Sequence, residues 1–440
     1  MDGLIQAAQL ILSLSILIVL HELGHFIPAK LFKTRVEKFY LFFDPWFSIF
    51  KFKKGDTEYG MGWLPLGGYV KISGMIDESM DKEQLAQEPQ PWEFRSKPAW
   101  QRLIIMIGGV TVNFLLAIFI YIMMLFIIGE EYLPAENVTY GIHADSLAME
   151  MGLEHGDNIL AVDGKQVEDF QRILPEIIIN EAKSLTIQRN GEVMELEIPG
   201  EVFKKLVSTK ATFITPRIPY VVQMVAENSV AEESGIKEGD RFVALNGQET
   251  EYFQEFREQM SKHKGEKITV TVIRDNAKED IEVQLTETGL LGIQVESDIA
   301  DFFEVKKINY NLASAIPAGV NKAFTTFEDY IRSMKLLFSP NVNASESVGG
   351  FITIGKAFSP QWDWVRFWSF TAFLSIILAI MNILPIPALD GGHVMFLLYE
   401  VVTGRKPNEK FLEYAQYAGM ILLLSLLLFA NGNDILKLFK

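Results

Sequence analysis

Residues 3–25 read GLIQAAQLILSLSILIVLHELGH, an uncharged run that ends in two histidines and a glutamate. A helix rises about 1.5 Å per residue and the hydrocarbon core of a bilayer is about 30 Å thick, so roughly 20 apolar residues span it. Residues 3–20 are therefore predicted to form a membrane-spanning helix. The run lacks the basic start and the small-residue cleavage site of a signal peptide, which favours a helix that is retained.

Three further stretches are uncharged over a comparable length: residues 103–128, 367–389 and 414–433. Basic residues lie between the first and second stretches and again between the third and fourth, and basic flanks resist translocation. The sequence therefore predicts a polytopic α-helical membrane protein with four transmembrane helices. The segment 26–102 is expected in the cytoplasm, and both termini and the long segment 129–366 are expected outside.

The composition excludes several classes of protein. The chain has 40 basic and 56 acidic side chains, a net charge of −16, whereas a nucleic-acid partner requires a basic surface. There is no cysteine, so disulfides, thiol nucleophiles and thiolate metal sites are excluded. Any transition metal must be bound by His, Asp or Glu.

The polar segment between the second and third stretches contains a duplication. Residues 152–164, GLEHGDNILAVDG, align with residues 235–247, GIKEGDRFVALNG. Each copy combines a Gly-x-x-x-Gly-Asp turn, a short β run and a hairpin signal. The pair resembles tandem PDZ domains, which are mixed β/α folds, here expected over residues 129–215 and 216–298. Such domains bind an extended peptide at a sheet edge, or they serve only as a steric screen.

Two motifs carry the chemistry. His21 and His25 are four residues apart, so on a helix both imidazoles project from one face and can hold one Zn²⁺ beside Glu22. A catalytic zinc normally has three protein ligands, and the candidate third is Asp390 in residues 382–393, NILPIPALDGGH. The prolines there break the helix, which is tolerated at membrane depth only where the backbone is buried or lines a cavity. The simpler readings are interfacial histidines and an ordinary helix terminus.

These motifs, in this order along nearly the whole chain, resemble the site-two protease family of intramembrane zinc metalloproteases, and by layout its bacterial branch that regulates sigma-E. The resemblance implies one Zn²⁺ held by His21, His25 and Asp390, with Glu22 as general base and acid. It implies that Asn382 orients the substrate backbone or stabilises the oxyanion. Residues 58–74 resemble a membrane-dipping hairpin of the family, which makes Gly67, Gly68 and Tyr69 candidates for pairing with an unwound substrate.

The resemblance also implies a bacterial inner membrane, with residues 21–25 near its cytoplasmic side and the PDZ domains outside. Expected partners are membrane lipid and single-span proteins already cut on their outer side, such as anti-sigma factors, or remnant signal peptides. An inactive PDZ scaffold or adaptor is the alternative, and a metal transporter is a third hypothesis that the isolated polar residues support poorly.

Residues 1–128 and 367–440 then form the membrane parts, and residues 299–366 a linker in which 315–338 has the pattern of an amphipathic helix. Residues 109–113, GVTVN, loosely resemble a Gly-Pro-x-x-Asn pattern of the family, with Val110 in place of the proline. Asn113 is then either a helix-packing hydrogen bond, the reading that we favour, or part of the polar shell of the site. Residues 348–351 also match a family motif only loosely, and His143, His155 and His263 are expected on the solvated surface.

Overall fold

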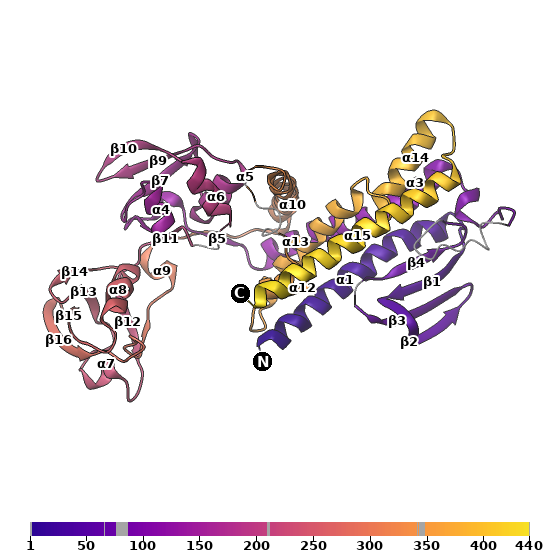
Figure 1. The fold of residues 1–440 in the computed structure, drawn as a ribbon. Coiled ribbons are helices and arrows are strands. Elements are labelled where there is room, and N and C mark those ends of the chain that lie inside the picture. Colours follow the sequence, from indigo (N-terminus) through magenta and orange to yellow (C-terminus); the bar gives the residue numbers. More distant parts are fainter. Residues whose placement is uncertain are drawn as a thin grey trace. The chain divides into compact units, whose positions relative to one another are not determined.

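The computed structural model describes residues 2–65, 67–75, 87–208, 212–340, 342 and 348–439. It divides into two compact units. The helical unit comprises residues 1–129, 309–334 and 344–440, and the repeat unit comprises residues 130–308 and 335–343. Figure 1 shows the long helices of the first unit and the antiparallel sheets of the second.

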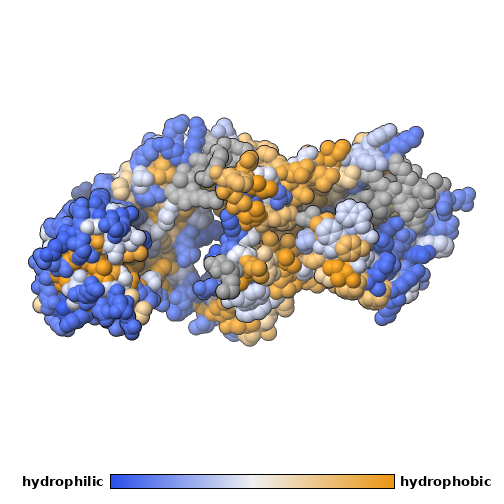
Figure 2. Space-filling model, turned by 60° about the horizontal axis from the view of Figure 1, so that its bottom comes forward, coloured by the Kyte–Doolittle hydropathy of each residue, from blue (hydrophilic) through white to orange (hydrophobic). Residues whose placement is uncertain are grey.

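Among the described residues, four helices are long and apolar enough to cross a membrane: α1 (Asp2–Leu31), α3 (Ala99–Ile127), α13 (Trp364–Ile383) and α15 (Glu409–Leu438). Each of them overlaps one of the four stretches predicted from the sequence, although the third ends before its stretch does. Large apolar side chains on them stay exposed, among them Phe119 at 60% and Leu428 at 74%. Figure 2 shows a largely hydrophobic surface over these helices, as expected for lipid contact.

Helices α1 and α3 cross where each has a glycine, Gly24 in α1 and Gly108 in α3. A Cβ at Gly24 would lie 2.5 Å from the carbonyl oxygen of Gly108, and one at Gly108 would lie within 2.0 Å of the carbonyl oxygen of Gly24. Pro28, one turn further along α1, has no N–H to bond the Gly24 carbonyl. Small residues let apolar helices approach closely, and here they bring α3 against the face of α1 that carries the histidines.

A four-stranded sheet follows α1. It contains β1 (Val36–Leu41), β2 (Phe43–Lys54), β3 (Thr57–Leu64) and β4 (Tyr69–Ile72), in the spatial order β2-β3-β1-β4. Strands β1 and β3 are parallel, whereas the other pairs are antiparallel. The short strand β4 is therefore an edge of the sheet.

The third predicted span is helical over only part of its length. Helix α13 ends at Ile383, and α14 (Asp390–Thr403) begins after a non-helical segment that contains both prolines. Gly391 and Gly392 allow that segment to fold back, because a Cβ on either would meet its backbone carbonyls at 2.2 or 2.6 Å. Helix α15 supports the segment, since the Gln416 side chain accepts a hydrogen bond from the backbone of Ala388 at 3.1 Å.

The expected amphipathic helix is α10 (Leu312–Leu336). Its apolar stripe packs on α3 and α13 through Ala323, with Phe327, Ile331 and Met334 beside it. At Gly319 the backbone lies against Ile122 of α3, where a Cβ would come within 2.5 Å. A short helix, α12 (Phe351–Ala357), is held by α15, whose Asp434 accepts hydrogen bonds from the backbone and hydroxyl of Thr353.

The repeat unit contains two similar domains with separate apolar cores. The first repeat has the sheet β10-β9-β7-β8 and the pair β11-β6, from the strands β6 (Ile142–Ala144), β7 (Asn158–Val162), β8 (Lys165–Gln166), β9 (Ser184–Arg189), β10 (Glu192–Glu197) and β11 (Ile214–Pro216). Its helices are α4 (Ser146–Glu150), α5 (Ile173–Ile179) and α6 (Gly200–Ser208).

The second repeat has the path β16-β15-β13-β12-β17, with β14 paired to β13. The strands are β12 (Tyr220–Val225), β13 (Arg241–Leu245), β14 (Gln248–Glu249), β15 (Lys267–Arg274), β16 (Ala277–Gln284) and β17 (Ile293–Val295), and the helices are α7 (Val230–Glu233) and α8 (Phe253–Met260). Helix α9 (Ile299–Phe302) follows, and then β18 (Lys306–Ile308) pairs with β5 (Glu130–Tyr132). The strands that open and close the inserted segment thus lie side by side.

The aspartate of each duplicated Gly-Asp turn binds an arginine, a contact that was not predicted from the sequence. In the first repeat Arg189 donates to the buried carboxylate of Asp157 at 2.8 Å and to the carbonyl of Gly152. In the second repeat Arg274 donates to Asp240 at 2.7 Å and to the carbonyl of Gly235. Each turn is thereby tied to the end of a strand more than thirty residues further on.

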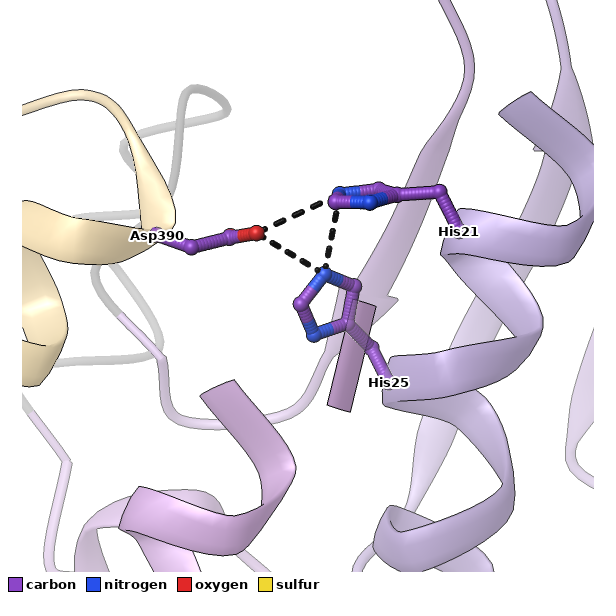
Figure 3. A group of neighbouring side chains, drawn as sticks. All are labelled: His21, His25 and Asp390. Carbon is purple, nitrogen blue, oxygen red and sulfur yellow. Dashed lines mark hydrogen bonds and ion pairs between the residues drawn. The ribbon is translucent and has the colours of Figure 1, made fainter. Parts of the chain in front are cut away.

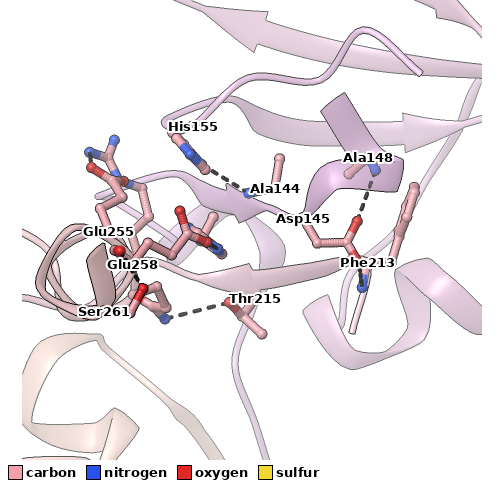
Figure 4. A network of polar contacts seen from close by, with 12 residues as sticks. Ala144, Asp145, Ala148, His155, Phe213, Thr215, Glu255, Glu258 and Ser261 are labelled. Carbon is pink, nitrogen blue, oxygen red and sulfur yellow. Dashed lines mark hydrogen bonds and ion pairs between the residues drawn. The ribbon is translucent and has the colours of Figure 1, made fainter. Parts of the chain in front are cut away.

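The two repeats meet in a polar network (Figure 4). Arg217 lies 2.7 Å from Glu255 of α8, and Nε2 of His143 lies 3.3 Å from Glu258. The rings of His143 and His155 stack with centroids 4.5 Å apart, and only 12% of the His143 side chain is exposed. The expectation that His143 is a solvated surface residue is wrong, because helix α8 of the other repeat covers it. His263 is one-third exposed beside Glu266, as expected of a surface residue.

Candidate active site

Helix α1 presents His21 and His25 on one face. Their rings meet edge to face with centroids 4.8 Å apart, and the two Nε2 atoms are 3.2 Å from each other. The spacing of four residues has the consequence expected from helix geometry, because both side chains project on the same side (Figure 3).

Asp390 reaches the same point from α14, of which it is the first residue. Its Oδ2 lies 3.2 Å from Nε2 of His21 and 3.3 Å from Nε2 of His25. This oxygen is buried and makes no hydrogen bond with any described residue. Residues separated by more than 360 positions in the chain are thus brought together, as Figure 3 shows.

The three atoms fit a zinc ion. Ligand atoms about 2.1 Å from a tetrahedral zinc lie about 3.4 Å apart, close to the spacings of 3.2 and 3.3 Å found here. Nδ1 of His25 lies 2.8 Å from the carbonyl oxygen of Ile105, to which it can only donate. A neutral His25 therefore directs the lone pair of Nε2 at the Asp390 carboxylate, and a cation between them removes that repulsion.

Helix α3 closes one side of the group. A Cβ at Gly109 would lie 2.4 Å from Nε2 of His25 and 2.6 Å from Cε1 of His21. The absence of a side chain at this position leaves room for both rings, and the Ile105 carbonyl one turn earlier orients one of them. Neither contact could be read from a local pattern in the sequence.

Glu22 faces a cavity of about 940 Å³ that the three ligand candidates also line. Its carboxylate interacts with the backbone amide of Val70 in β4. Gly67, Gly68 and Tyr69, predicted as substrate-binding, line the same cavity. Gly68 allows β4 to approach α1, because a Cβ there would lie 2.6 Å from Ile18.

Tyr69 is fixed by its neighbours. Its hydroxyl donates to Asp44 at 2.9 Å, and its ring stacks on Tyr40 and Phe43. These contacts are with β1 and β2, so the sheet as a whole sets the position of its edge strand.

Asn382 lies near the end of α13 and also lines the cavity. Its side-chain nitrogen is 3.5 Å from Nε2 of His21. The break after Ile383 places this amide and Asp390 on opposite sides of the non-helical segment, and both face the histidines. All the residues predicted from the sequence for catalysis, metal binding and substrate binding therefore meet in one cavity of the helical unit.

A second group of possible ligands, His143, His155 and Glu255, has its ligand atoms within 4.8 Å of one another. It fits a metal poorly. The two rings are stacked at an interplanar angle of 11°, so the lone pairs in their planes do not converge. Arg217 already binds the carboxylate of Glu255. We interpret this group as an ion-paired contact between the repeats.

Comparison with known proteins agrees with this geometry. The chain is 28% identical to a putative zinc metalloprotease of Vibrio cholerae, with 97% of this chain and 98% of that protein covered. It is 28% identical to the regulator of sigma E protease of Haemophilus influenzae over the full length of both, and 29% identical to the regulator of sigma-E protease RseP of Escherichia coli over 98% of both. The model of Peptidase family M50 matches residues 9–426. The chain therefore belongs to peptidase family M50 and is a zinc metalloprotease of the site-two type.

Proposed function

We propose that this protein is an intramembrane zinc endopeptidase that hydrolyses peptide bonds within the transmembrane segments of single-span membrane proteins. The observation that carries the proposal is the position of the donor group. His21, His25 and Asp390 converge, with Glu22, in a cavity that is lined in part by α1, α3 and α13, which are apolar enough to span a bilayer. Polar and ionisable groups at such depth are costly and mark functional sites.

Each residue has a role that follows from its chemistry. His21, His25 and Asp390 would hold the ion, which would supply Lewis-acid polarisation of the scissile carbonyl and make bound water more acidic. Glu22, beside them in the cavity, takes the proton from the attacking water and passes it to the nitrogen of the leaving amine. Asn382 carries an amide that donates to the carbonyl oxygen of the substrate as negative charge develops there.

The sheet supplies a way to hold the substrate. A helical segment keeps its peptide bonds in its own hydrogen bonds, so the scissile region must be unwound before attack, and the freed groups need new partners in the membrane. Strand β4 is an edge whose residues line the cavity beside Glu22. An extended substrate segment pairs with this edge next to Gly67, Gly68 and Tyr69.

We further propose that the two repeats are PDZ domains on the outer side of a bacterial inner membrane, with the HELGH end of α1 near the cytoplasm. The duplicated turns and the flanking basic residues support this arrangement. Two relatives bear the name regulator of sigma E protease. The substrate class is then an anti-sigma-factor-like protein already cut on its outer side, or a remnant signal peptide.

The test is cleavage of a tagged single-span reporter by the purified chain in detergent. The variant Glu22→Gln and chelator-treated native protein should both lose cleavage, and Glu22→Gln should retain bound zinc. Cleavage that survives in both preparations would contradict the proposal. If no preparation cleaves, a reporter truncated on its outer side is tested next. If Glu22→Gln loses both its bound zinc and its cleavage activity, Glu22 is needed to bind the metal and is not only the proton acceptor.

A further inference from the structure

Asn113 of α3 contacts the group of proposed metal ligands, His21, His25 and Asp390, at the outer edge of the His21 ring. It is fully buried in α3, and its side-chain amide is 3.2 Å from Nδ1 of His21. This is the ring nitrogen opposite Nε2, the atom that faces Asp390 and His25. A helix-packing hydrogen bond, the reading of Asn113 favoured from the sequence, does not account for this contact.

The ring chemistry of His21 determines what it requires there. An imidazole that uses the lone pair of Nε2 to bind a metal carries its proton on Nδ1, so Nδ1 is a hydrogen-bond donor. A donor buried without an acceptor is costly, and ligating histidines usually have such an acceptor. For His25 the acceptor is the carbonyl of Ile105. For His21 the group in the equivalent position is the amide of Asn113.

The side-chain amide of Asn113 contains an oxygen that can accept the hydrogen bond from Nδ1 of His21. In the structure the side-chain nitrogen of Asn113 lies near Nδ1 of His21, and Oδ1 is buried without a hydrogen-bond partner among the described residues. The oxygen and nitrogen ends of an amide have nearly the same size and shape, so the side chain can exchange them in the same space. A half-turn of the amide brings Oδ1 to Nδ1, and the contact becomes a donor-acceptor pair of the sense that a ligating His21 needs.

The backbone of Asn113 is also anchored. The hydroxyl of Ser375 in α13 donates to its carbonyl oxygen at 2.7 Å. Asn382, two turns further along α13, approaches His21 from its Nε2 side. Helices α3 and α13 therefore contact the same imidazole at its two nitrogens, from positions that are fixed relative to each other.

We propose that Asn113 is a positioning residue of the metal site, which accepts a hydrogen bond from Nδ1 of His21 and so fixes the tautomer and the direction of Nε2. The proposal rests on the proposed function, because it requires His21 to be a ligand. It makes Asn113 a determinant of zinc affinity, whereas a residue that only packs helices affects stability with and without metal alike.

The experiment measures zinc affinity by chelator competition in the full-length chain in detergent, with Glu22→Gln as the background to prevent self-cleavage. Asn113→Leu keeps the approximate volume and removes the acceptor, so the affinity should fall about 10- to 100-fold. Asn113→Asp restores an acceptor and should bind zinc at least tenfold more tightly than the leucine variant. The control is Ser13→Ala, which removes a buried hydroxyl that contacts Thr371 at 2.9 Å in the same unit, and it should leave zinc affinity unchanged.

The melting temperature of the zinc-free protein distinguishes a residue that positions His21 from a residue that only packs helices. If Asn113→Leu lowers it as Ser13→Ala does and both keep native zinc affinity, Asn113 is a packing residue and the proposal is wrong. Equal loss of zinc affinity in the leucine and aspartate variants would also overturn it. His21→Ala tests the ligand set independently, because native zinc affinity in that variant would refute the proposed function itself.

Discussion

Because Gly109 has no side chain, the rings of His21 and His25 can lie directly against the backbone of α3. The predicted ligands could be identified from the sequence because His21 and His25 have helical spacing and Asp390 stands alone in an uncharged stretch. Gly109 stood out only through the loose match of residues 109–113 to a family motif, and nothing in the sequence indicated Ile105, since both contribute through the path of the backbone where α3 meets α1. A glycine inside a helical pattern only hints at close packing.

The variant Gly109→Ala should therefore lose zinc binding. The added methyl group would lie 2.4 Å from Nε2 of His25, the atom predicted to ligate, so the ring must leave the position that it now occupies beside Asp390. Bound zinc after purification gives the result directly. Gly432→Ala in α15, where an added Cβ meets nothing within 4 Å, is the matched control. Native zinc content in both variants would show that the ring has room to adjust.

At the scale of the elements, the sequence predicted helices well and the first sheet only in part. The stretch 58–74 was predicted as a hairpin, but β3 pairs with β1 in parallel and β4 joins β1 from the other side. The order and direction of the strands depend on which segments meet after α1, and the alternation of residues within one strand does not encode them. In the repeats the turns were predicted, whereas their arginine partners were not.

Those partners should decide the stability of each repeat. Removing Arg274 leaves the carboxylate of Asp240, which is fully buried, without its counter-ion. Breaking a buried pair in this way costs on the order of 3 kcal/mol. We expect Arg274→Met to make the second repeat sensitive to proteolysis at lower denaturant concentration. Arg332→Met, which breaks an exposed pair with Glu328 in α10, should leave that concentration unchanged.

The contact between the repeats should weaken in acid. Burial and the neighbouring His155 lower the pKa of His143, against the opposite effects of Glu258 and Glu255, while Arg217 also lowers it. A histidine whose pKa is lowered in the closed state binds protons more readily when the contact opens. The contact is therefore at full strength above the ordinary value of about 6.5 and weakens as the pH falls below it.

Hydrogen exchange of α8 between pH 7.5 and 5.5, corrected for the intrinsic effect of pH, measures this change. Protection of α8 should fall at the lower pH in the native chain, and the pH dependence should be smaller in His143→Gln. Equal pH dependence in the two proteins would assign the effect to other groups.

For the whole molecule, the order of the parts followed from the sequence because lipid and water impose opposite compositions. The uncharged stretches became α1, α3, α13 and α15, and the polar stretch between the second and third became the repeat unit. One uncharged stretch is not helical throughout. Residues 384–389 are as apolar as the rest of the third stretch, but the prolines end the helix at Ile383. The function of that break is visible only in the site that it forms.

The predicted orientation in the membrane can be tested with introduced cysteines, because the chain has none of its own. Lys54→Cys lies at the exposed end of β2 and Lys278→Cys lies in the exposed strand β16. In cells whose outer membrane is permeable to it, a maleimide that cannot cross the inner membrane should label position 278 and label position 54 only after lysis. The reverse pattern would invert the orientation that the basic flanks predict.

The pairing of β5 with β18 bears on how such a protein can change over time. The segment from residue 133 to residue 305 leaves and returns through adjacent strands, and none of the proposed metal or catalytic residues lies within it. A genetic event that shortens, duplicates or exchanges this segment need not alter the distance that the remaining chain has to bridge. The duplication of its two domains is one product that such an architecture tolerates, and the chemistry in the helical unit can persist while what surrounds it is replaced.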